Sequence, residues 1–99
     1  MLIKVGKHSE NNSEYIGRSS PLGNPYIMMD NSKIERNRVC DLYELWFNEK
    51  IQKDDPVVMK ELDRLYKIAG NNNLILGCFC SPLRCHGETI KNYLLLKLL

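Results

Sequence analysis

The sequence predicts a compact α/β domain with a small, mainly parallel sheet and about three helices, in the order β(β)ααβα. The segment LILGCFC at residues 74–80 is apolar on both of its faces, which is typical of a central strand in a buried parallel sheet. Two long helical segments precede this strand and one follows it. The chain has 99 residues, the length of a single domain, so we expect one unit spanning 1–99.

The first half of the chain predicts one or two short strands and a long helix. Residues 1–5, MLIKV, alternate in the manner of a strand, and residues 15–17 predict a second, shorter one. Ser32 and Glu35 have the spacing of a capping box, so a helix should run from residue 33 to about residue 51. We expect its apolar face to comprise Ile34, Val39, Leu42, Tyr43, Leu45 and Trp46.

The second half predicts two further helices on either side of the central strand. Asp55 followed by Pro56 is typical of a cap and a first-turn proline, and Gly70 should end the helix that begins there. The last helix should run from about His86 to Leu98. Because the central strand is apolar on both faces, we expect helices to cover both sides of the sheet.

Composition excludes some classes of partner. The net charge is +2 and no run of like charge exceeds two residues, so the basic surface that duplex DNA requires is missing. The longest apolar run, YLLLKLL at residues 93–99, is interrupted by Lys97 and is too short to span a membrane. We therefore predict a cytoplasmic protein whose four cysteines are thiols or ligands and do not form disulfides.

Two loops should meet at the carboxyl edge of the sheet, where parallel α/β proteins bind their ligands. The first, residues 17–25, offers the fork-shaped guanidinium of Arg18 and neutral donors. The second leads into the last helix, whose free N–H groups would face an anion, and Gly87 would allow close approach. The predicted ligand-binding residues are Gly17, Arg18, Ser19, Ser20, Asn24, Arg36, Cys80, Cys85, His86 and Gly87.

Arg36 is included because a cation in the first turn of a helix opposes the helix dipole, which indicates a charged partner. A purely structural interpretation of the same residues remains open. In that interpretation Arg18 pairs with Glu14 or Glu35, and the prolines and glycines of the first loop serve only to stiffen it.

The cysteines allow a metal interpretation, which we do not favour from the sequence. Cys78, Cys80, Cys85 and His86 supply the four ligands that zinc prefers, but Cys85 and His86 are adjacent and should point in different directions. We therefore expect no metal ligands and no cofactor. Cys78 should be a small apolar residue in the core of the central strand.

Thiol chemistry is a further alternative. Cys78 and Arg84 have the spacing of the phosphate-binding loop of protein tyrosine phosphatases, but Pro82 removes one backbone donor and no glycine eases the turn. Cys80 or Cys85 could be activated by the helix N-terminus and His86, although no acid or amide is visibly placed to orient that histidine.

The two loops also carry a family resemblance. The segments YIGRSSPLGNPY at residues 15–26 and CFCSPLRCHGETI at residues 78–90, with Arg36, Tyr43 and Trp46 between them, resemble the signatures of the family called domain of unknown function 4326. These are small proteins of bacteriophage and bacterial genomes. The resemblance implies that both loops belong to one site and that the chain is phage-encoded, in which case the host cytoplasm is its location. It implies no particular activity.

We therefore predict a small-molecule-binding protein that captures a phosphorylated, nucleotide-like ligand between the 17–25 loop and the helix start at 80–87. The family context extends this to the sequestration of a host nucleotide signal. The alternatives are a nucleotide-processing enzyme (a hydrolase or a glycosyl transferase) with Glu88 or His86 as acid or base, and a zinc-stabilised interaction module. We expect neither duplex DNA nor a membrane as a partner.

Overall fold

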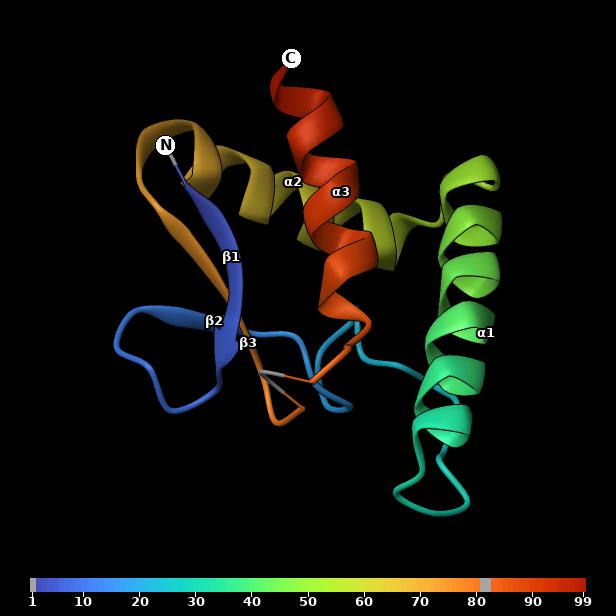
Figure 1. Cartoon of the computed structure of the whole chain (residues 1–99). Coiled ribbons are helices and arrows are strands. Elements are labelled where there is room, and N and C mark those ends of the chain that lie inside the picture. The colour runs from blue at the N-terminus through green and yellow to red at the C-terminus, as the bar shows by residue number, and fades with distance from the viewer. Residues whose placement is uncertain (1, 81–82) are drawn as a thin grey trace.

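A computed structural model describes residues 2–80 and 83–99 of the chain. The elements in order are β1 (Ile3–Lys7), β2 (Ser13–Tyr15), α1 (Lys33–Gln52), α2 (Pro56–Asn71), β3 (Leu74–Cys78) and α3 (Gly87–Leu98). In Figure 1 the sheet lies at the left, with α3 and then α1 to its right. The fold is α/β, with the element order that the sequence predicts.

The sheet has three parallel strands in the order β1-β3-β2. The segment that is apolar on both faces is thus the central strand, as predicted, and Leu76 at its middle aligns with Val5 of β1 and Glu14 of β2. Strand β3 ends at Cys78, two residues before the predicted end. Strand β2 is formed by Ser13–Tyr15, so most of the predicted second strand belongs to the loop that follows.

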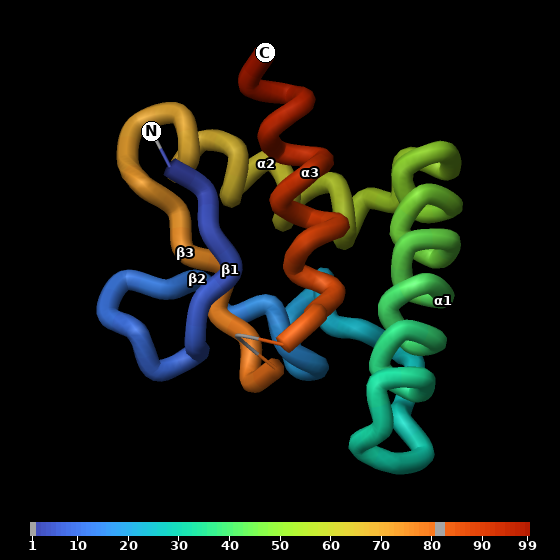
Figure 2. Tube along the Cα trace, viewed as in Figure 1, coloured from blue at the N-terminus to red at the C-terminus, as the bar shows by residue number. Residues whose placement is uncertain are grey.

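A five-residue connection, residues 8–12, carries the chain from β1 across β3 to β2 and is the blue loop in Figure 2. The backbone N–H of His8 donates to the carbonyl of Cys78 at 3.3 Å, and Ser13 Oγ donates to the carbonyl of His8 at 2.9 Å. A Cβ atom on Gly77 would lie only 3.1 Å from His8 Cα. The absence of a side chain at Gly77 therefore lets the connection lie directly against the sheet.

The main core forms on one face of the sheet. Leu74, Leu76 and Cys78 alternate onto this face, and buried residues from each of the three helices join them in one apolar cluster. The opposite face carries Ile75, which is half-buried, and Gly77, which is buried, and the 8–12 connection lies against it. The expectation of helices on both faces is therefore wrong, because a loop can approach where glycine replaces a side chain.

Helix α1 buries a narrower stripe than predicted. Val39, Tyr43 and Phe47, spaced four residues apart, are buried against the core, whereas Ile34 and Leu45 are 81% and 68% exposed. A helix at the edge of the molecule contacts the core along one line only, so apolar residues off that line stay in solvent.

The predicted caps of α1 and α2 are present. Ser32 Oγ accepts the N–H of Glu35 at 3.1 Å. Asp55 directly precedes Pro56, and its carboxylate accepts the N–H of Val58 at 3.1 Å. Within residues 2–80 and 83–99, no helix combines the length and the apolar character that crossing a bilayer requires.

Candidate functional site

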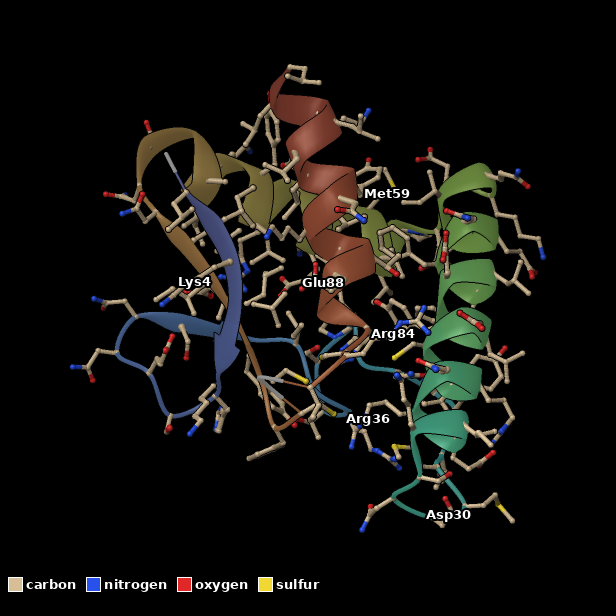
Figure 3. All side chains as sticks on the ribbon, viewed as in Figure 1. Lys4, Asp30, Arg36, Met59, Arg84 and Glu88 are labelled. Carbon is tan, nitrogen blue, oxygen red and sulfur yellow. The ribbon has the colours of Figure 1, made fainter. Side chains whose placement is uncertain are left out.

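A pocket of about 320 Å³ opens between the first loop, the start of α1 and the segment that joins β3 to α3. This volume is within the range of small-molecule sites. We call it the loop pocket, and it is lined by Tyr15, Gly17, Arg18, Asn24, Tyr26, Met28, Arg36, Val39, Cys40, Cys78, Phe79, Cys80, Arg84, Cys85 and His86. In Figure 3, Arg36 and Arg84 lie in the space between α1 and the end of the sheet.

The structure brings together most, but not all, of the predicted ligand-binding residues. Those that line the loop pocket are Gly17, Arg18, Asn24, Arg36, Cys80, Cys85 and His86. Ser19, Ser20 and Gly87 are not among the lining residues. The list of predicted ligand-binding residues did not include three aromatic residues of the wall, Tyr15, Tyr26 and Phe79. From the sequence, Tyr15 and Tyr26 could stack on a base, but their spacing favoured core positions.

Among the described residues, two arginines of the pocket have no acidic partner. Across the described ranges 2–80 and 83–99, neither Arg18 nor Arg36 has a carboxylate oxygen within 4.0 Å. The proposed pairing of Arg18 with Glu14 or Glu35 is wrong. These two carboxylates are held elsewhere, Glu14 by Arg64 at 2.7 Å and Glu35 by Arg38 at 2.7 Å.

Arg84, in contrast, holds the second loop against α1. Its guanidinium donates to Asp41 at 2.8 Å and to Asn37 Oδ1 at 3.0 Å, and the hydrogen bond to Asp41 raises the pKa of Arg84 further. The phosphatase interpretation requires this guanidinium to face an anion beside the Cys78 thiol. Its engagement with Asp41 and Asn37 argues against that role.

Asn24 braces the first loop. Its side-chain amide donates to the carbonyl of Val39 at 3.1 Å, and its Oδ1 accepts the N–H of Tyr26 at 2.9 Å. Both polar atoms are therefore engaged within the protein. Ser20 is similarly local, because its Oγ accepts the N–H of Leu22 at 3.3 Å. These residues shape the loop.

The N-terminus of α3 differs from the expected anion site. The N–H of Gly87 donates to Cys85 Sγ at 3.4 Å, that of Glu88 to the carbonyl of Cys85 at 3.1 Å, and that of Thr89 to the carbonyl of His86 at 3.1 Å. The turn that begins the helix thus uses the donors that were expected to be free.

Gly87 lies in a tightly packed position. A Cβ atom there would lie 2.9 Å from Ile16 Cδ1 and 3.1 Å from both methyl carbons of Val5. The glycine therefore allows the first turn of α3 to approach β1 and the start of the first loop closely. The predicted role, close approach of a ligand to this backbone, is not needed to explain the residue.

His86 is buried, with only 6% of its surface exposed. Its Nε2 lies 2.6 Å from the carbonyl of Ile16 and its Nδ1 lies 3.4 Å from Cys85 Sγ, while the ring packs edge-on against Tyr43. The expectation that Cys85 and His86 point in different directions is therefore wrong. The carbonyl of Ile16, at the start of the first loop, draws the imidazole inward.

The thiols form a connected group in the pocket wall. Cys78 is buried in the core, as expected, and its Sγ accepts the N–H of Cys80 at 3.4 Å. Donation from the Cys85 thiol lowers the pKa of Cys78, and the same contact raises the pKa of Cys85. Cys78 is thus the more acidic thiol of this pair. All four cysteines, Cys40 included, are free and line the loop pocket.

Tyr15 and Phe79, two aromatic residues of the loop pocket wall, pack against His8, which is not among the lining residues. The centroid of the His8 ring lies 4.7 Å from that of Tyr15 and 5.0 Å from that of Phe79. The Phe79 side chain directly follows the central strand and is 76% exposed. An exposed aromatic ring beside an apolar pocket can provide a stacking surface for a planar ligand.

Comparison with known proteins identifies the family. The profile of the family described as "Domain of unknown function (DUF4326)" matches residues 3–95, which include both loops and every strand. Searches among curated proteins and among solved structures gave no match. Because the match extends over most of the chain and includes the whole loop pocket, the protein belongs to the DUF4326 family.

Proposed function

We propose that the protein binds a phosphorylated, nucleotide-like small molecule in the loop pocket. The observation that carries this proposal is the contrast among the five arginines of the chain. Within the described residues, the three that form ion pairs are Arg38, Arg64 and Arg84, and the two that do not are Arg18 and Arg36. Both of these line the loop pocket. Guanidinium groups without a carboxylate partner favour an anionic ligand with planar, bidentate geometry, such as a phosphate.

The remainder of the wall favours an aromatic or heterocyclic group attached to that phosphate. Tyr15, Tyr26 and Phe79 line the loop pocket together with Met28 and Val39. Apolar and aromatic walls with a few convergent polar groups are typical of small-molecule sites, and aromatic rings stack on every nucleobase. A nucleotide combines the two chemistries that this wall offers.

The same geometry favours binding over turnover. Glu88, the carboxylate suggested for an enzyme, is exposed and is not among the residues that line the loop pocket. His86 has both ring nitrogens in contact with other atoms of the protein. The role of general acid or base would require Glu88 to reach the loop pocket, or His86 to leave its present contacts.

The test uses a panel of nucleoside mono-, di- and triphosphates with cyclic and linear signalling nucleotides, measured by isothermal titration calorimetry. Arg18→Ala should weaken the best binder by about 2–4 kcal/mol, because it removes charge-assisted hydrogen bonds to phosphate. The melting temperature should change little, since Arg18 forms no ion pair within the described residues. Arg36→Ala should also weaken binding.

Arg64→Ala is the matched control. It removes the same charge from an arginine that pairs with Glu14 and Glu61, away from the loop pocket, so affinity should stay near that of the wild type. Equal losses of affinity in the Arg18, Arg36 and Arg64 variants would indicate general electrostatic attraction and contradict the proposal. Absence of binding across the whole panel would contradict it as well.

A further inference from the structure

We propose that Cys78, Cys85 and His86 form a zinc site in the wall of the loop pocket. All three residues are buried, and one potential ligand atom from each lies within 4.8 Å of the other two. In a tetrahedral zinc site with sulfur and nitrogen ligands, neighbouring ligand atoms are separated by about 3.5–3.8 Å. Cys85 Sγ and His86 Nδ1 are 3.4 Å apart, just below this spacing.

The hydrogen bond of His86 leaves the correct nitrogen for a metal. Nε2 lies 2.6 Å from the carbonyl oxygen of Ile16, which can only accept, so Nε2 carries the proton. In the neutral ring, Nδ1 then has a lone pair, and it faces Cys85 Sγ. Metal-binding histidines usually donate their other N–H to a carbonyl or carboxylate, and this contact fixes both tautomer and ring orientation.

Each sulfur also has the backbone donor that is typical of a thiolate ligand. The N–H of Cys80 donates to Cys78 Sγ and the N–H of Gly87 donates to Cys85 Sγ, both at 3.4 Å. In both cases the donor lies two residues after the cysteine. Hydrogen bonds to metal-bound sulfur stabilise its negative charge and set its direction.

The ligand set selects the ion. Two thiolates and one imidazole suit zinc, whereas magnesium and calcium require oxygen ligands. The three proposed ligands line the loop pocket, and so does Cys80. A fourth ligand would therefore reach the ion from the pocket side. The proposal rests on this buried group alone and is independent of the phosphate ligand proposed above.

The competing explanation is a metal-free core in which the Cys85 thiol donates to Cys78 and His86 Nδ1 only lies beside Cys85 Sγ. Titration of the reduced, chelator-treated protein with Co²⁺ distinguishes the two. A bound Co²⁺ should produce sulfur-to-metal charge-transfer bands and the intense visible bands of a tetrahedral ion, saturating at one equivalent. Addition of Zn²⁺ should displace the cobalt and raise the melting temperature, because the folded state alone holds the assembled site. A reduced protein without these bands would overturn the proposal.

Substitutions test the assignment of each ligand. Cys78→Ser, Cys85→Ser and His86→Gln should each lower the affinity for zinc by at least about tenfold to a hundredfold, the loss that follows even from removal of an outer hydrogen-bond partner. Cys40→Ser is the matched control, because Cys40 is a buried thiol of the same pocket outside the proposed ligand group, and it should keep the cobalt bands. Bands that survive the three ligand substitutions, or that disappear with Cys40→Ser, would contradict the assignment.

The proposal can also be tested without variants, so a substitution that prevents folding does not leave it undecided. X-ray absorption of the zinc-loaded wild-type protein reports the ligand atoms directly, and the expected first shell contains two sulfurs and one imidazole nitrogen. A first shell of oxygen and nitrogen atoms only would show adventitious surface binding and overturn the proposal. Loss of nucleotide binding with intact zinc binding, or the reverse, would separate the two proposals.

Discussion

The hydroxyl of Tyr43 joins helix α1 to the first loop. Tyr43 is fully buried, and its OH donates to the carbonyl of Leu22 at 2.7 Å. Burial also raises the pKa of Tyr43, so the phenol stays protonated and remains a donor. Tyr43→Phe should lower the free energy of unfolding by about 1–2 kcal/mol, because it leaves the Leu22 carbonyl without its partner in a dry environment.

Urea denaturation of Tyr43→Phe beside Tyr66→Phe measures this contribution. Tyr66 lies on α2 and is exposed, so its substitution should change stability by less than about 0.5 kcal/mol. Equal effects in the two variants would mean that water replaces the hydroxyl of Tyr43 at no cost.

At the level of single residues, the sequence predicted Cys78 better than His86. Alternation along an apolar strand places Cys78 in the core, and this depends only on neighbouring residues. The burial of His86 depends on the carbonyl of Ile16, which lies 70 positions away. A local pattern carries no signal for such a contact. For the same reason, the partners of Glu14 and Glu35 could not be assigned from the sequence.

The first turn of α1 is tied to the preceding loop by one carboxylate. Glu35 accepts the N–H of Met29 at 2.8 Å and hydrogen bonds from Arg38 at 2.7 and 2.8 Å. The hydrogen bonds from Arg38 and from the Met29 backbone lower the pKa of Glu35 to about 2. The ionised form therefore stabilises the folded state.

The sign of the pH dependence follows from this lowered pKa. The contribution of Glu35 is fully present above its ordinary pKa of 4.5 and is lost as the pH falls toward about 2. Glu35→Gln should thus have a lower free energy of unfolding than the wild type at neutral pH, and this difference should become smaller below pH 4.5. Urea denaturation across the acid range measures it. A difference in the free energy of unfolding that stays constant down to the lowest pH at which the protein folds would contradict the role of the charge.

At the level of elements, helix starts were more predictable than helix ends and buried faces. The prediction that Gly70 ends the second helix is wrong, because α2 continues to Asn71 and a single glycine is tolerated within a helix. Ser32 and Asp55 mark helix starts through bonds to residues three positions away, which a sequence displays directly. The exposure of Ile34 and Leu45 depends instead on where α1 lies in the molecule. Figure 1 shows this helix at the edge, farthest from the sheet, where only a narrow stripe meets the core.

The crossing of the 8–12 connection over the sheet is a property of the whole molecule, and Gly77 permits it. Gly77→Ala should destabilise the protein by about 1–3 kcal/mol, because the new Cβ would lie 3.1 Å from both His8 Cα and Ser13 Oγ. The backbone of the connection would have to move, and with it the hydrogen bond between His8 and Cys78. Thermal and urea denaturation measure the loss.

Gly70→Ala is the control for this substitution. Gly70 lies in α2, and a Cβ atom there would meet nothing within 4 Å. Alanine favours a helix more than glycine does, by up to about 1 kcal/mol, so this variant should be as stable as the wild type or more stable. If Gly77→Ala were as stable as Gly70→Ala, the 8–12 connection would be able to move away from the new Cβ atom without loss of stability.

At the level of the whole chain, the class, the element order and the parallel central strand followed from the sequence, but the crossing did not. Neighbouring parallel strands require a connection of a dozen residues or more, so a five-residue link gives no hint of parallel strands. The short link is possible because β1 and β2 are not neighbours in the sheet: β3 lies between them. That arrangement depends on a strand that begins only at Leu74.

The position of β3 also sets the order in which the protein can assemble. Residue 3 pairs with residue 74 and residue 13 with residue 75, so no ladder of the sheet joins segments that are close in the sequence. A nascent chain leaving the ribosome therefore carries β1 and β2 as unpaired segments until β3 has been synthesised. Helices α1 and α2, whose hydrogen bonds are local, can form during that interval. The sheet closes last, and its folding rate should be limited by this long-range search.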